Sequence, residues 1–190
     1  VTDDVTGEKC LEITSMDAST TIGFMLPEHN TPQTGYTDGY YALQYDIMSL
    51  DKDTTVNDNK NGITTMAGGN SGAVQNIASY MPWSGVAYVK NDGTTTLPTL
   101  YPDNRTWTTI RVLFNAKSGS DTTMLMYAKG VKDGSVVEVH GPADGPYVPT
   151  TYSRRVRNLY CFGWTLPAKY GTGARIKDIS FYSITEDEFN

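Results

Sequence analysis

The sequence predicts an all-β fold, and three observations lead to this prediction. The 190 residues include 13 Tyr and 26 Thr, which are residue types that favour strands over helices. Apolar and polar residues alternate over many short segments, as they do in strands with one buried face. Clusters of Gly, Pro, Asp and Asn interrupt each segment before a helical period can extend over three turns.

The N-terminal third shows the alternation most clearly. Leu11 and Ile13 share one face of a strand, and Ile22, Phe24 and Leu26 follow, so the two segments predict an opening hairpin. The next strand has two distinct faces. We expect its core face to be Tyr41, Leu43, Tyr45 and Ile47, and its other face to be Tyr40, Ala42, Gln44, Asp46 and Met48.

The later strands are shorter and are separated by turn residues. They are expected at roughly 73–80, 85–90, 106–116, 124–129, 136–140, 156–163 and 176–184. About ten strands at this spacing indicate a sandwich or a barrel in one domain covering 1–190.

Composition excludes some functions. The net charge of -6 leaves no broad basic surface for phosphates, so nucleic acid is not an expected partner. No apolar run reaches the ~18 residues of a membrane helix, so membrane insertion is not expected. We expect a secreted or cell-surface module of a larger, bacterial protein. Cys10 and Cys161 form either one disulfide or two free thiols.

Four segments in the C-terminal half carry a resemblance to a known family. They are Trp107–Asn115, Met124–Gly130, Tyr160–Gly163 and Ala174–Tyr182. In this order they resemble the strands of concanavalin-like jelly rolls of the laminin G type. The resemblance implies a two-sheet antiparallel jelly-roll β-sandwich, in a family whose members bind glycans or proteins and include some lyases and glycosidases.

Catalytic patterns are sparse in the sequence. Glycosidases use two carboxylates about 5–9.5 Å apart, but Glu12 and Glu138 stand alone on their strands and Glu186 to Glu188 lie in a predicted solvated tail. A jelly-roll lyase needs converging His, Tyr, Gln and Arg side chains, and only His29 and His140 are present. The sequence therefore predicts that the chain is not an enzyme.

A metal site is a separate prediction. Side-chain oxygens alternate before Gly62 as they do in the first half of a calcium loop, although the closing Glu is missing. The predicted calcium ligands are Asp51, Asp53, Asn57, Asn59 and Asn61. A plain loop of Asx turns explains the same residues.

Exposed aromatic residues are the expected binding groups, because the apolar faces of sugar rings stack on them. Trp83 lies in a turn and Trp164 follows a predicted strand end, whereas Trp107 is expected in the core. Polar partners are predicted on the non-core face, at Tyr40, Gln44 and Arg111. The sequence thus predicts a non-catalytic carbohydrate-binding module, with a protein-binding or adhesion module, or a lyase or glycosidase, as alternatives.

Overall fold

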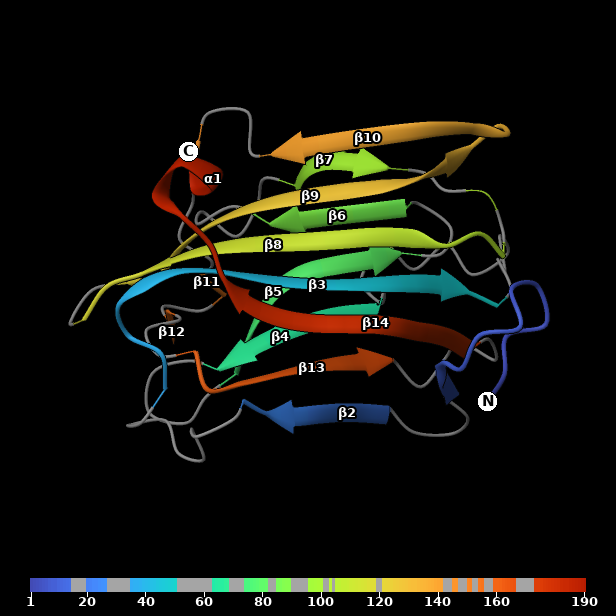
Figure 1. Cartoon of the computed structure of the whole chain (residues 1–190), viewed down its shortest axis with the longest axis horizontal. Helices are drawn as coiled ribbons and strands as arrows, with labels where there is room; N and C mark the ends of the chain where they lie inside the picture. Colours follow the sequence, from blue (N-terminus) through green and yellow to red (C-terminus); the bar gives the residue numbers. More distant parts are fainter. Residues whose placement is uncertain are drawn as a thin grey trace.

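The computed structural model describes most of the chain as two packed sheets (Figure 1). The described residues are 1–14, 20–26, 35–50, 63–68, 74–81, 85–89, 96–100, 103, 105–118, 121–141, 145–146, 150–151, 154–155, 159–166 and 173–190. They form fourteen strands and one short helix, and every strand pair is antiparallel. The predicted all-β, two-sheet jelly-roll sandwich is confirmed.

The front sheet, which lies nearer the viewer in Figure 1, has the strand order β1-β14-β3-β8-β9-β10. Its strands are β1 (Leu11–Thr14), β14 (Gly173–Ser183), β3 (Gly39–Ser49), β8 (Thr108–Ala116), β9 (Thr123–Lys132) and β10 (Ser135–Gly141). The first and last strands of the chain are therefore neighbours.

The back sheet has the order β2-β13-β4-β5-β6-β7. Its strands are β2 (Thr20–Met25), β13 (Cys161–Leu166), β4 (Ile63–Gly68), β5 (Val74–Met81), β6 (Gly85–Val89) and β7 (Thr96–Leu100). A small separate pair consists of β11 (Thr150–Thr151) and β12 (Arg154–Arg155).

The core lies between the two sheets and follows the predicted alternation of β3. Leu43, Tyr45 and Ile47 are fully buried, and Tyr41 packs against them. Across the sandwich, Phe162 and Trp164 of β13 complete the cluster. Burying these large apolar side chains provides the main driving force for the sandwich, at about 1.5–3 kcal/mol for each aliphatic or Phe side chain.

Three expectations about the strands are corrected. The opening hairpin is wrong, because β1 pairs with β14 in the front sheet while β2 pairs with β13 in the back sheet. The strand expected at 156–163 is β13, which runs from Cys161 to Leu166. The strands β4, β7, β11 and β12 are missing from the prediction. Cys10 and Cys161 are free thiols, and the second lies in the back sheet while the first precedes a strand of the front sheet.

A tight turn joins β9 to β10. Asp133 and Gly134 both have positive φ, at 51° and 72°, which is the conformation of a two-residue type I′ hairpin turn. The backbone N–H groups of both residues donate to the carboxylate of Asp103 over 2.9 Å each. This turn sets the register of the hairpin and places Tyr127 opposite His140.

The C-terminal residues form a helix, which corrects the expectation of a solvated tail. The helix α1 (Glu186–Phe189) begins after Thr185 with a capping box, in which the backbone N–H of Glu188 donates to the Thr185 hydroxyl and that of Thr185 donates to the Glu188 carboxylate. No helix in the described part of the chain has the length and apolar character of a membrane span.

Candidate functional site

The outer face of the front sheet, turned away from the back sheet, is divided into three rows that cross the strands. The apolar row is Ala42, Leu113 and Leu125. The central row is Gln44, Arg111, Tyr127 and His140. The outer polar row is Asp46, Thr109, Lys129 and Glu138.

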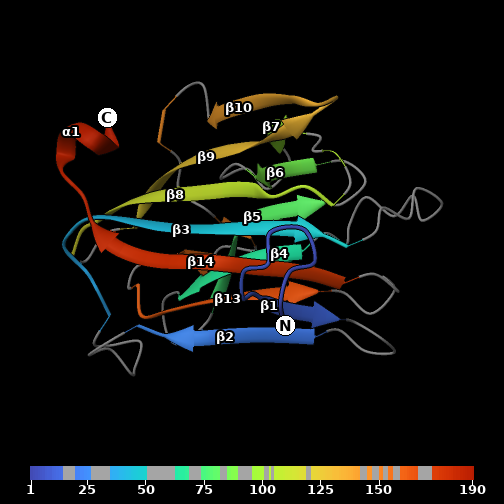
Figure 2. The same ribbon diagram turned by 45° about the vertical axis from the view of Figure 1, so that its right-hand side comes forward.

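Helix α1 covers the apolar row and leaves the central row beside it. Phe189 is 2% exposed and packs on Ala42 and Leu113, with Tyr40, Leu125 and Tyr127 around it. Figure 1 and Figure 2 both show α1 at one end of the front sheet, near β8 and β9. The helix therefore forms a wall along one side of the central row.

The central row brings four different polar groups together from four adjacent strands. Gln44 on β3 is paired with Arg111 on β8, Arg111 with Tyr127 on β9, and Tyr127 with His140 on β10. Adjacent strands are about 4.8 Å apart, so the row spans about 14 Å. One extended ligand lying across the strands can contact all four side chains.

At one end of the row, two rings and a carboxylate are in contact. The rings of Tyr127 and His140 are 4.5 Å apart and nearly perpendicular. The Nε2 atom of His140 lies 3.1 Å from Oε1 of Glu138. When the neutral imidazole donates from Nε2 to this carboxylate, the lone pair that can accept a proton is on Nδ1.

Arg111 lies in the middle of the row and is only partly satisfied by the protein. Its Nη2 is 3.8 Å from Oε1 of Glu188, and its guanidinium is 5.9 Å from the ring centre of Tyr182. Its Nε is buried and has no hydrogen-bond partner among the described residues. Because 30% of the side chain is exposed and Glu188 lies beyond hydrogen-bond distance, an anionic ligand can still reach the guanidinium.

A pocket of about 320 Å³ opens at the His140 end of the row. Tyr127, His140, Pro146 and Asn190 are among the residues that line it, so it lies between the sheet, the segment after β10 and the end of α1. Small-molecule sites commonly have this combination of an apolar lining and a few polar groups.

The structure separates the predicted binding residues. Tyr40, Gln44 and Arg111 lie together on the outer face, and whether they bind carbohydrate stays a prediction. The prediction that Trp164 is an exposed binding residue is wrong, because this side chain lies in the core, is 1% exposed and has no face free for a sugar. Trp83 and the predicted calcium ligands lie outside the described residues, so the calcium site stays a prediction.

Sequence reasoning missed the part of the site that Tyr127 and His140 form together. The prediction places His140 at the end of the strand 136–140 and assigns no role to Tyr127. Within the described ranges, no group of three or more His, Cys, Asp or Glu side chains is arranged to hold a metal ion.

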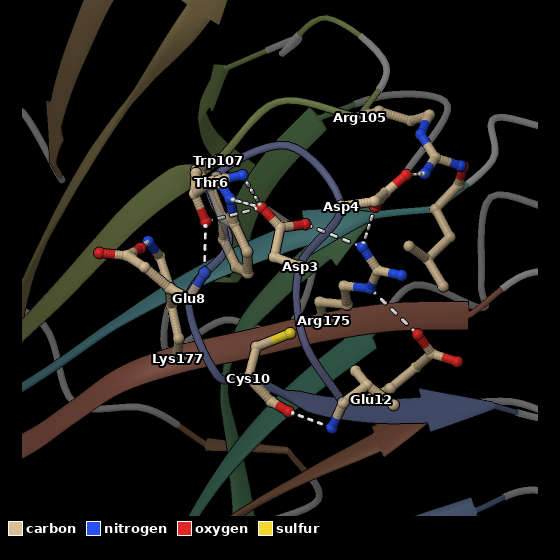
Figure 3. Close-up of polar contacts among 12 residues, drawn as sticks. Asp3, Asp4, Thr6, Glu8, Cys10, Glu12, Arg105, Trp107, Arg175 and Lys177 are labelled. Atoms are coloured by element: carbon tan, nitrogen blue, oxygen red, sulfur yellow. Dashed lines mark hydrogen bonds and ion pairs between the residues drawn. The ribbon is translucent and has the colours of Figure 1, made fainter.

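A second polar cluster lies at the N-terminus and has a structural role (Figure 3). The carboxylate of Asp3 is buried and accepts hydrogen bonds from Thr6, from the indole N–H of Trp107 and from Arg175. Arg175 also bonds Glu12 over 3.0 Å and pairs with Asp4. The carboxylates are thus occupied by protein cations, and the cluster ties the N-terminal segment to β14. Trp107, expected in the core, is half-buried here.

We expect this cluster to make stability depend on pH in the acid range. Burial alone would raise the pKa of Asp3, but hydrogen bonds from Thr6, Arg175 and Trp107 outweigh it and lower the pKa from 3.8 to about 2. A lowered folded-state pKa stabilises the protein above the unfolded pKa. This stabilisation, about 2 kcal/mol, is lost as the pH falls from about 4 to about 2.

Urea unfolding of the wild type and of Asp3→Asn between pH 5 and pH 2 measures this contribution. Asp3→Asn should lack the corresponding part of the pH dependence, whereas Asp187→Asn, on an exposed position of α1, should retain it. A wild-type pH dependence in Asp3→Asn would contradict the assignment.

The sequence matches no profile of a known protein family, and no curated protein matches it. Solved structures do match. The chain is similar to the marine PL-14 alginate lyase from Aplysia kurodai, with a TM-score of 0.57 and 10% identity over 95% of this chain and 85% of that chain. It is also similar to the binding domain of botulinum neurotoxin serotype G, with a TM-score of 0.47 and 11% identity over 97% of this chain and 46% of that chain.

The likeness to the alginate lyase overturns the prediction that the chain is not an enzyme. That prediction rests on the sparse catalytic residue types in the sequence. The same sandwich, over 95% of this chain, is the fold of a polysaccharide lyase. At 10% identity the likeness establishes the fold alone, and the resemblance to the laminin G type in particular stays a prediction.

Proposed function

We propose that the chain binds an acidic polysaccharide along the central row and cleaves it by β-elimination. The observation that carries the proposal is the register that aligns Gln44, Arg111, Tyr127 and His140 on one exposed face. The alginate lyase of similar fold supports the reaction class and the class of substrate. A uronate residue of such a polymer bears a carboxylate next to the carbon that loses its proton.

Each group in the row has a part in this chemistry. Arg111 and the amide of Gln44 bind the uronate carboxylate and stabilise the negative charge that develops on it when the neighbouring C5–H bond breaks. His140 accepts the C5 proton. The C5–H electrons form the C4=C5 double bond, the C4–O bond breaks, and Tyr127 gives its proton to the leaving oxygen.

The remaining neighbours have supporting parts. Glu138 orients the imidazole of His140, from two residues away on the same face of β10. The pocket beside Tyr127 and His140, on the side of α1, provides space for a sugar residue. The half-buried position of Arg111 strengthens its interaction with a carboxylate relative to a fully solvated arginine.

A panel of polysaccharides tests the proposal. Incubation with alginate, polygalacturonate or another uronate polymer should produce the ultraviolet absorbance of a double bond conjugated with a carboxylate. Carboxyl-reduced versions of the same polymers should give none, because they lack both the charge that Arg111 binds and the group that acidifies C5–H.

The possible outcomes separate the alternatives. Protein that is retained on an acidic polymer but releases no product would support the binding site and overturn the proposed cleavage. Neither retention nor product with any acidic polymer would overturn both, and would favour the protein-binding alternative.

A further inference from the structure

Helix α1 is held on the outer face by contacts that do not involve Arg111. Phe189 fills the apolar row, and its ring centre is 5.5 Å from that of Tyr40. The hydroxyl of Tyr40 donates to Glu186 over 2.7 Å, and the backbone N–H of Ile184 donates to the carbonyl of Tyr40 over 2.9 Å. The position of the helix is therefore set independently of any ligand in the central row.

The two carboxylate oxygens of Glu188 have different surroundings. Oε2 accepts from the backbone N–H of Thr185 over 2.9 Å, as part of the capping box. Oε1 lies 3.8 Å from Nη2 of Arg111. The helix cap thus holds a negative charge next to the cation in the middle of the central row.

This arrangement allows a ligand carboxylate to approach Arg111 more closely than Glu188 does. A separation of 3.8 Å is longer than a hydrogen bond, and 30% of the Arg111 side chain is exposed to a ligand. A carboxylate on a ligand can form two hydrogen bonds with a guanidinium. The negative charge of Glu188 repels the carboxylate of such a ligand as it approaches Arg111.

We infer that Glu188 is a specificity-determining residue that competes with the ligand carboxylate for Arg111. The inference rests on the proposed function. Glu188 lowers the affinity of the row for acidic sugars and leaves the affinity for neutral ones unchanged. The charge of Glu188 thereby reduces the preference of the row for a uronate over a neutral sugar.

The substitution Glu188→Gln tests this role without removing the helix cap, because Gln also completes a capping box. It should tighten the binding of an alginate oligosaccharide about two- to fivefold at low ionic strength, as expected for an exposed ion pair. The gain should shrink as salt screens the charges. Asp187→Asn removes the same charge from the neighbouring position and is the matched control.

Binding is measured by calorimetry with the alginate oligosaccharide and with its carboxyl-reduced form. Tighter binding of the acidic ligand alone, by Glu188→Gln but not by Asp187→Asn, supports the competition. Equal effects of the two variants, or the same gain with the reduced ligand, would overturn it while leaving the proposed function intact. Wild-type protein that binds no acidic oligosaccharide would overturn the proposed function, and this inference with it.

Discussion

Replacing Tyr127 by Phe is expected to slow polysaccharide cleavage at least about hundredfold and to leave the melting temperature unchanged. The hydroxyl is the proposed proton donor to the leaving oxygen, and general acid catalysis typically contributes a factor of this size or larger. The ring itself remains, so its packing against His140 and beneath Phe189 is retained. Retention of the polymer should change little, because Arg111 and Gln44 still bind the carboxylate.

Tyr182→Phe is the matched control for this prediction. Tyr182 lies on β14 opposite Ala42, it is 39% exposed, and it contacts Arg111 from outside the central row. Initial rates are compared at saturating polymer concentration, with circular dichroism melts on the same samples. A wild-type rate in Tyr127→Phe, or an equal loss in Tyr182→Phe, would remove Tyr127 from the mechanism.

The faces of the strands could be predicted from the sequence, but their partners could not. The alternation in β3 correctly assigned Leu43, Tyr45 and Ile47 to the core. Alternation has a period of two and specifies a face only, so it contains no information on which strand lies alongside. The opening hairpin was wrong for this reason, since β1 and β2 each pair with strands from the C-terminal end of the chain.

The sequence contains a signal for one half of the central row, the pairing of Tyr127 with His140. Asp133-Gly134 is a strong two-residue hairpin signal, and counting outward from it places Tyr127 opposite His140. The sequence contains no such signal for the other half, the pairing of Gln44 with Arg111. Gln44 and Arg111 are separated by β4 to β7, and their register depends on how the two core faces pack against the back sheet.

The C-terminal helix also had a sequence signal. Thr185 and Glu188 match the capping-box spacing, and the apolar Phe189 follows directly. That the helix would lie on Ala42 and Leu113 depends on tertiary packing, and residue spacing alone does not indicate it.

The prediction that Trp164 lies exposed at the rim of the sandwich is wrong because its strand extends further than expected. The strand was expected to end at Gly163, which would place Trp164 at the rim. It continues to Leu166, so Trp164 lies on the same face as Phe162 and is buried with it. Its ring contacts Tyr45 edge-on, with centres 5.1 Å apart, and lies 5.9 Å from Phe24.

Trp164→Ala is therefore expected to destabilise the fold by about 3 to 5 kcal/mol, because it removes a large buried ring and leaves a cavity between the sheets. For a chain of this size the melting temperature should fall by roughly 10 °C. Trp164→Phe fills most of the space and removes an indole N–H that has no partner among the described residues. This variant should therefore lose much less stability than Trp164→Ala. Thermal melts measure both variants, and polymer retention is compared well below the lower melting temperature. Under those conditions both variants should bind as the wild type does, because Trp164 contacts the core and not the ligand. A wild-type melting temperature with lost retention in Trp164→Ala would instead return this tryptophan to the binding surface.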